Sequence, residues 1–167
     1  MATNRYSLAD HIVVITLPDD NQEVLERSGL KANAPITIGG PGQNGNEGSF
    51  VGSIKVSRKE DLWDTQGDPT GSWVHNKSLN RTGNVDIDIN QISDDVIRLS
   101  MICNAYEAIQ GAVGGLTIEV INAFNLDLPS IAVCSDCLIT KIPDQNLGEK
   151  AEEQGWSFTC GRVMFYS

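Results

Sequence analysis

The sequence predicts a mainly β protein, built from sandwich-like or barrel-like antiparallel sheets with one α-helix. Apolar and polar residues alternate over much of the chain, as expected for strands that bury one face. A single stretch, from Gln91 to Gly111, instead repeats its apolar residues at three- and four-residue steps, which is typical of an amphipathic helix. With 167 residues, the chain fits one domain around one core.

The clearest predicted strand runs from Asn84 to Asn90. Val85, Ile87 and Ile89 make its apolar face, and the residues between them are aspartates. Aspartate is depleted in strands, so two of them are tolerated only on a face that meets water or a counter-charge. We therefore expect a sheet that is wetted on one side.

Further β-rich runs are each bounded by Gly, Pro, Asn or Asp, so the sequence predicts roughly six or seven strands. They run from His11 to Leu17, Phe50 to Ser57, Leu116 to Phe124, Ile131 to Ile142 and Gly155 to Tyr166. The stretch from Asp64 to Leu79 is polar and shows little strand signal. We expect a connection there, with a turn at Asp64 to Pro69.

The predicted helix has an apolar stripe that includes Leu99 and Tyr106, which suits packing on a sheet. Asp94 and Asp95 lie in its first turn, where the positive end of the helix dipole favours carboxylates. Glycines that begin at Gly111 end it. One helix packed on antiparallel sheet is therefore the expected architecture.

One long loop, at about residues 19–48, interrupts the single expected domain of residues 1–167. A connection of about 30 residues with little regularity is usually functional, or is ordered by a partner. Its end is rich in glycine but lacks the residues of a P-loop or a dinucleotide site. We expect this end to be an assembly loop, with candidate residues Gly39, Gly40, Pro41, Gly42, Gly45 and Gly48.

The chain is acidic: 12 Lys and Arg stand against 22 Asp and Glu, for a net charge of -10. This charge repels phosphate backbones, so tight DNA binding is disfavoured. It does not exclude DNA passing nearby, because polyanions slide along a wall of carboxylates without sticking. The longest apolar stretches, such as Ile12 to Leu17, are far shorter than the roughly 20 residues of a membrane span. With no signal-peptide pattern at the start, we expect a soluble protein made in the cytosol.

Catalytic signatures are missing from the sequence. Asp86 and Asp88 lie on one strand face about 7 Å apart by strand rise, but no histidine, third carboxylate or calcium-loop register accompanies them. No G-x-S-x-G motif occurs, and neither His11 nor His75 has an acid partner in a recognisable order. We therefore expect no enzyme, no cofactor and no metal site.

The four cysteines are Cys103, Cys134, Cys137 and Cys160. Without an export signal, reduced thiols are favoured over a disulfide framework. Cys134 and Cys137 have CxxC spacing but lie in a strand-like run, whereas redox CxxC motifs lie at a helix N-terminus. A zinc site lacks two further ligands at suitable spacing. A disulfide between subunits, formed in an oxidising medium, stays open as an alternative.

The order of these segments resembles a family of bacteriophage tail tube proteins over roughly Phe50 to Phe165. The matching parts are the segment Thr82 to Ile89, the helix Gln91 to Ala108, the strand Thr117 to Ala123, the segment Cys137 to Asp144 with its Lys-x-Pro-Asp element, and the Trp-x-Phe-x-Cys strand within Gly155 to Gly161. These patterns are specific in combination rather than singly. The long connection at residues 19–48 and the stretch Glu60 to Leu79 depart from the family pattern.

The resemblance implies two packed antiparallel sheets with one helix, in subunits that close into a hexameric inner β-barrel. It implies stacked rings inside a contractile sheath, in the tail of a virion assembled in the host bacterial cytoplasm. The implied partners are further copies, the tail sheath protein, a tape-measure protein, and tail completion and baseplate proteins, with DNA passing through without specific binding. If they face the bore, Asp86, Asp88 and Glu119 would hold DNA off the wall by repulsion.

Besides a phage tail tube protein, the sequence leaves three alternatives open. One is the tube protein of a contractile injection or secretion system, which the fold alone does not distinguish from a phage tail tube protein. The second class is a soluble β-sandwich binding module for carbohydrate, using the glycine-rich loop and the tryptophans Trp63, Trp73 and Trp156, which otherwise serve as core or interface anchors. The third is a small redox protein acting through Cys134 and Cys137.

Overall fold

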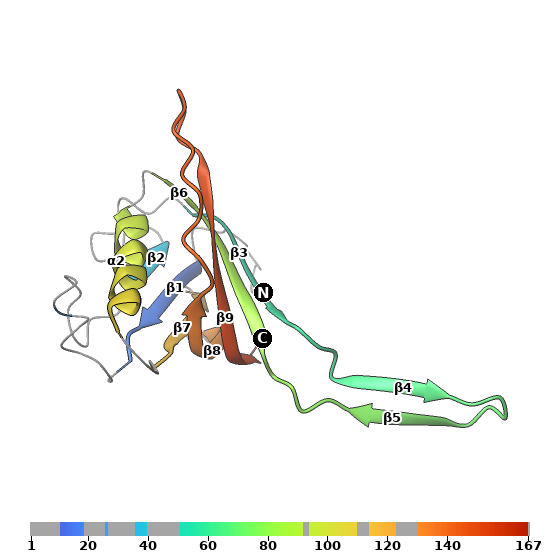
Figure 1. Ribbon diagram of the computed structural model, residues 1–167. Helices are drawn as coiled ribbons and strands as arrows, with labels where there is room; N and C mark the ends of the chain where they lie inside the picture. Colours follow the sequence, from blue (N-terminus) through green and yellow to red (C-terminus); the bar gives the residue numbers. More distant parts are fainter. Residues whose placement is uncertain are drawn as a thin grey trace, which may run out of the picture.

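The computed structural model describes residues 11–18, 26, 36–39, 51–91, 94–109, 114–122 and 130–166. Within these residues lie nine β-strands and helix α2 (Figure 1). The elements in chain order are β1 (His11–Thr16), β2 (Ile36–Gly39), β3 (Val51–Arg58), β4 (Trp63–Gly67), β5 (Trp73–Lys77), β6 (Gly83–Asn90), α2 (Asp94–Ala108), β7 (Leu116–Asn122), β8 (Ser130–Ile139) and β9 (Glu153–Phe165).

Seven of the strands form one antiparallel sheet in the order β2-β1-β7-β8-β9-β6-β3. The sheet curls into a half-barrel, and β4 pairs with β5 in a separate two-stranded sheet (Figure 1). The expected mainly β, barrel-like fold with a helix is confirmed. All six pairings in the large sheet are antiparallel, so each strand can bury one face and wet the other.

The two faces of the large sheet differ in polarity. We call the side that carries Val85, Ile87 and Ile89 the inner face, and the side that carries Asp86 and Asp88 the outer face. The three apolar residues are fully buried, which confirms the alternation expected for this strand. Neighbouring strands continue the inner face, because directly paired residues of antiparallel strands point the same way.

Helix α2 packs on the inner face and contacts β2 and β6. Its buried residues include Val96, Leu99 and Ile102, which join the same apolar core as the inner face of the sheet. Asp95 in the first turn is buried and pairs with Arg98 at 3.5 Å. The expected helix is therefore confirmed.

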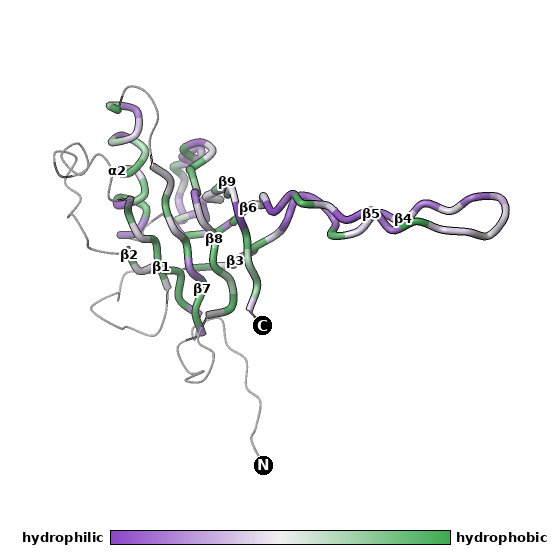
Figure 2. The backbone as a smooth tube through the Cα atoms, turned by 90° about the horizontal axis from the view of Figure 1, so that it is seen from below, coloured by the Kyte–Doolittle hydropathy of each residue, from purple (hydrophilic) through white to green (hydrophobic). Residues whose placement is uncertain are grey.

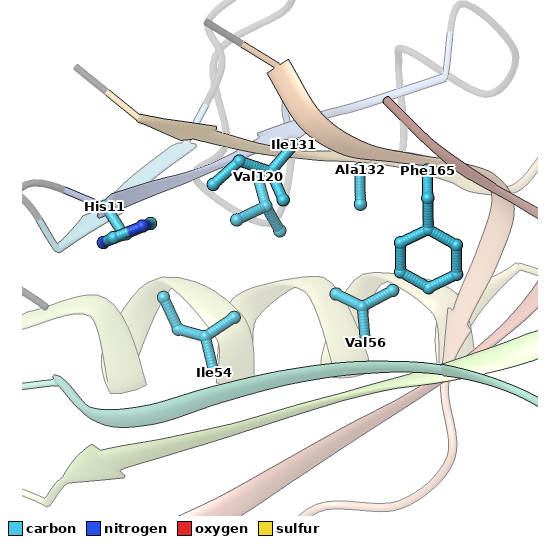
Figure 3. A pocket seen from close by; sticks show the side chains of 7 residues that line it. All are labelled: His11, Ile54, Val56, Val120, Ile131, Ala132 and Phe165. Atoms are coloured by element: carbon cyan, nitrogen blue, oxygen red, sulfur yellow. The ribbon is translucent and has the colours of Figure 1, made fainter. Parts of the chain in front are cut away.

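The curl brings the edge strand β3 opposite β7 and β8. Ile54 and Val56 of β3 face Val120 and Ala132 across an apolar pocket that Phe165 of β9 also lines (Figure 3). Strands that are far apart in the order of the sheet therefore share one interior. A half-barrel of this shape leaves two edge strands, β2 and β3.

A bulge in β8 places both cysteines of the CxxC segment in the core. Cys134 and Cys137 are three residues apart, which in a regular strand would put them on opposite faces. Asp136 adopts a left-handed conformation with φ of 55°, and two residues of β8 oppose one residue of β7 at this point. The backbone at Gly115 approaches Asp136 so closely that a Cβ there would clash with it.

The stretch from Asp64 to Leu79 corrects the sequence prediction. It holds β4 and β5 rather than a connection without strands. The turn was expected at Asp64 to Pro69 but lies at residues 68–72, because residues 64–67 belong to β4. We call residues 59–82 the arm; it projects from the half-barrel (Figures 1 and 2). Both faces of its strands are exposed, so the one-sided burial that marks strands in a sequence is missing. With β2 inside the expected long loop, these two strands raise the number to nine.

Candidate channel surface and assembly arm

The outer face holds Asp86 and Asp88 together, as the sequence predicts for one strand face. The Ser157 hydroxyl of β9 donates to Asp86 Oδ1 at 2.8 Å, and the Ser53 hydroxyl of β3 donates to Asp88 Oδ2 at 2.8 Å. Lys55 lies directly opposite Asp86 in the β3–β6 register. Strands β3, β6 and β9 thus form a polar sector in which hydroxyls and one ammonium group flank the carboxylates.

Glu119 lies on the same outer face but in a different sector. Its neighbours Ile118 and Val120 are buried on the inner face, so Glu119 points outward, where its register partners are Val14 and Val133. Strands β8 and β9 separate it from β6, a step of roughly 14 Å at the usual spacing of strands. The structure therefore gathers the three candidate carboxylates on one face without making them a cluster.

The arm extends the β3–β6 pair away from the body. Lys59 N donates to Thr82 O, and Ser78 N donates to Leu62 O, so backbone hydrogen bonds continue from the sheet into the β4–β5 ladder. The ladder then pairs Trp63 with Lys77. From residue 59 to the tip the arm spans about ten residues, or roughly 30 Å at the usual strand rise.

One face of the arm is aromatic. In the β4–β5 register Trp63 faces Lys77, Thr65 faces His75 and Gly67 faces Trp73, so both indoles lie on one side. Trp63 and His75 meet edge to face with ring centroids 6.5 Å apart, and Lys77 Nζ lies 6.0 Å from the Trp63 ring centroid. Trp63 and Trp73 are nevertheless 55% and 66% exposed.

The tip of the arm is ordered by one carboxylate. Asp68 Oδ1 accepts hydrogen bonds from Thr70 N, Thr70 Oγ1 and Ser72 N at 2.6–3.0 Å. These bonds, the Thr70 hydroxyl first, lower the pKa of Asp68. Gly71 follows with φ of 88°, a conformation that favours glycine. The tip is thus a defined turn of Pro and Gly flanked by two short strands that each begin with tryptophan.

Sequence reasoning missed the arm as an element, although signals for it were present. Asp68, Pro69 and Gly71 are turn residues, and a tryptophan precedes them and another follows. The sequence predicted that the three tryptophans are core or interface anchors. Trp156 is a core residue at 1% exposure, whereas Trp63 and Trp73 are exposed on the arm.

The candidate assembly loop is described only at its first residue. Gly39 ends β2 with φ of 82°, opposite Ile12 of β1, and a Cβ there would meet His11 O at 3.1 Å. Gly40, Pro41, Gly42, Gly45 and Gly48 lie outside the described residues. The assembly role of this loop therefore stays a prediction.

The cysteines fall into two environments. Cys103 on α2 is partly buried, and burial, followed by the nearby Glu107, raises its pKa to about 11. Cys134, Cys137 and Cys160 are buried together as free thiols, with the Cys137 and Cys160 sulfurs 2.9 Å apart. Hydrogen bonds from its two neighbours lower the pKa of Cys134, and hydrogen bonding with Cys134 raises the pKa of Cys137.

Among the described residues, no group of three or more His, Cys, Asp or Glu side chains is arranged to hold a metal ion. No helix in the same residues is long and apolar enough to cross a membrane.

A curled antiparallel half-barrel packed against one helix defines a mainly β protein. A family model described as the bacteriophage PhiTE tail tube protein matches residues 27–165, so the chain belongs to this family of phage tail tube proteins. The resemblance seen in the sequence is confirmed. The family is a structural one, which agrees with the expectation that the chain is not an enzyme, and its place is the tail of the virion.

Solved structures share the fold at low sequence identity. A chain of the anti-feeding prophage baseplate has a TM-score of 0.54 at 9% identity, covering 100% of this chain and 98% of that one. A chain of the anti-feeding prophage tube-terminating cap has a TM-score of 0.53 at 14% identity, covering 100% and 94%. The sheath/tube terminator of an extracellular contractile injection system has 0.51 at 12%, covering 100% of both chains. A search of curated protein sequences gives no match.

Proposed function

We propose that six copies of this chain form a ring and that rings stack into the tail tube, the channel for genome ejection inside a contractile sheath. The observation that carries the proposal is the arm, whose aromatic face has no covering surface within the described chain. Chains of similar fold come from a baseplate described as 6-fold symmetrised and from tube-terminating complexes, which supports a hexameric ring in a contractile assembly.

The arm needs a partner to be a stable element. A two-stranded hairpin is marginally stable in water, because it has no third strand or helix to cover its apolar face. Each tryptophan can bury roughly 150–250 Å² at an interface, and tryptophan is enriched among residues that dominate binding energy. A neighbouring copy that covers Trp63 and Trp73 would therefore order the arm, and a reach of roughly 30 Å suits contact with the next ring.

Ring closure follows from the edges of the half-barrel. Strands β2 and β3 end the seven-stranded sheet, and exposed edges invite pairing with other strands. Copies placed side by side would close these edges into a continuous inner barrel. Closure would also remove the risk that the edges pair at random.

The outer face is the surface we assign to the bore. Asp86 and Asp88 would lie on it with the serine hydroxyls of β3 and β9, and Glu119 would lie on the same wall. With -10 per chain, such a ring is acidic, so DNA would be repelled from the wall and would not stick during passage. The inner face and α2 would then point away from the bore.

The remaining partners follow from this placement. The sheath protein would contact the outside of the tube, a tape-measure protein and later DNA would occupy the bore, and completion and baseplate proteins would meet the ends. Assembly would take place in the host bacterial cytoplasm. The tube of a contractile injection system is the related alternative; it would carry protein cargo, and a DNA-filled particle would argue against it.

The arm is tested by replacing Trp63 and Trp73 with alanine in one double variant. We expect the monomer to fold as before, since both side chains are exposed, and the concentration needed for tube formation to rise at least about tenfold. Electron microscopy of the purified protein and analytical ultracentrifugation measure rings, tubes and that threshold.

Ile97→Ala is the matched control, because Ile97 is an equally exposed apolar residue at 59% but lies on α2. Tubes of unchanged yield are expected from it. Tubes of normal length from the tryptophan double variant would overturn the role of the arm. A parent protein that stays monomeric at high concentration and binds glycans would favour the carbohydrate-binding module instead.

A further inference from the structure

Three buried thiols lie together where β8 meets β9. Cys134 and Cys137 come from β8 and Cys160 comes from β9, and each is at most 2% exposed. The bulge at Asp136 is what turns both cysteines of β8 toward the core. Nothing in the tube function described above requires sulfur at these positions, because packing alone would be met by small apolar residues.

The geometry distinguishes one pair within this group. Cys137 and Cys160 are direct register partners, whereas Cys134 lies opposite Val163. Their sulfurs are 2.9 Å apart, so the two side chains point at one another. Cα atoms of directly paired residues in antiparallel strands are about 4.5–5.5 Å apart, within the range that a disulfide spans.

We propose that Cys137 and Cys160 are an oxidation site, at which a low-molecular-weight disulfide such as oxidised glutathione forms a cross-strand disulfide within the chain. A thiolate of the pair attacks one sulfur of oxidised glutathione, giving a mixed disulfide and releasing one reduced glutathione. The second thiol loses its proton and attacks the mixed disulfide, which releases a second reduced glutathione. The two protein sulfurs are oxidised, and one glutathione disulfide is reduced.

The disulfide would stabilise the subunit after assembly by cross-linking two strands. In the reducing cytoplasm the thiols stay free, and in the oxidising medium outside the cell the bond can form. It would tie β8 to β9, which are also the two longest strands of the half-barrel. Burial makes the reaction slow, because the oxidant reaches these sulfurs only when the strands open transiently.

The test uses the purified full-length protein, incubated with oxidised glutathione and then unfolded with a thiol-blocking reagent. Tryptic cleavage alone leaves Cys103, Cys134 and Cys137 on one peptide, because no Lys or Arg lies between Arg98 and Lys141. A second protease that cuts before aspartate separates Cys134 from Cys137 at Asp136. Mass spectrometry of the unreduced peptides then identifies the bonded pair.

We expect a peptide that joins Cys137 to Cys160, the loss of two free thiols per chain, and a Tm higher by roughly 5–10 °C that a reducing agent reverses. Cys137→Ser should abolish the bond and the shift in Tm. Cys134→Ser is the matched control and should retain both. In reducing buffer the Tm of each variant reports whether the substitution itself disturbs folding.

Three results would overturn the proposal. One is a disulfide that includes Cys134, one is a stable mixed disulfide with glutathione, and one is a full complement of free thiols after prolonged oxidation. Each is independent of tube formation, which the arm variants test separately.

Discussion

At the scale of single residues, the strict alternation in β6 gives the most direct link between sequence and structure. Val85, Ile87 and Ile89 are fully buried, and the aspartates between them accept hydrogen bonds from serines on adjacent strands. A strand with this pattern has one register that buries its apolar residues. The sequence therefore predicts both the face and its polarity.

Ile87 offers a quantitative test of this core. Ile87→Ala should lower the free energy of unfolding by about 2–5 kcal/mol, because it leaves a cavity beside Trp156, its register partner. Ile87→Val, the matched control, should cost about 0.5–1.5 kcal/mol. Denaturant unfolding followed by tryptophan fluorescence measures both, and equal effects of the two variants would contradict full burial at this position.

Local pattern is insufficient at the bulge in β8. Regular alternation places Cys134 and Cys137 on opposite faces, yet both are buried. The left-handed conformation of Asp136 and the space left by Gly115 and Gly161 decide this. Asp136 lies in β8, Gly161 lies in β9 and Gly115 directly precedes β7, so no short window of the sequence contains the arrangement.

At the scale of elements, the arm differs from every strand of the half-barrel. It has an aromatic face, but no core lies beneath that face within the described chain. A strand is recognised in a sequence by the alternation that results from burying one face. The arm strands lack this alternation, because the surface that would cover them is proposed to belong to another copy. The helix and six of the strands were predicted because the surface that buries them is part of the same chain. Strand β2 is buried by the same core but was missed, because it is only four residues long.

Asp68 provides a test at this scale. Asp68→Ala removes the acceptor for three hydrogen bonds, so amide hydrogen exchange at Thr70 and Ser72 should accelerate severalfold while the Tm of the body changes little. Asp68→Asn, which keeps an acceptor oxygen, should exchange more slowly than the alanine variant. Unchanged exchange in both variants would show that the carboxylate does not order the tip.

The same carboxylate predicts a pH dependence. The pKa of Asp68 is lowered in the folded arm, so its contribution to order is present above the ordinary pKa near 3.8 and is lost as the pH falls through the lowered value. Protection of the tip amides, measured as the exchange rate relative to the intrinsic rate at each pH, should therefore fall only in strongly acid solution.

At the scale of the whole molecule, the net charge and the sheet topology would make the wall of the proposed channel acidic. A net charge of -10 disfavours tight DNA binding, and the outer face of the half-barrel carries carboxylates in two sectors, one with Asp86 and Asp88 and one with Glu119. Membership of the tail tube family indicates that the chain belongs to a tube, and we propose that the outer face lines the bore of that tube.

Replacing both Asp86 and Asp88 with lysine in the phage tests that placement. The fold should be retained with a modest loss of stability, because the variant removes the acceptors for Ser157 and Ser53 and puts a like charge opposite Lys55, whereas genome ejection and infectivity should fall. The cause would be attraction between the lysines and passing phosphates.

The double asparagine variant, Asp86→Asn with Asp88→Asn, is the matched control. It removes the negative charge but keeps acceptors for Ser157 and Ser53, so it separates charge from hydrogen bonding. Normal ejection by the lysine variant would show that this sector does not line the bore.

The sequence by itself determined the mainly β class, the helix, the polar face at Asp86 and Asp88, and the tail tube family. Each of these rests on a period or an order of segments that is written along the chain. Only the tertiary structure decided that one sheet curls until β3 faces β7, that Cys137 meets Cys160, and that residues 59–82 form an arm. The reason is physical: these features depend on surfaces that meet across the fold, or on a partner outside it, and neither leaves a periodic trace in the residues that form them.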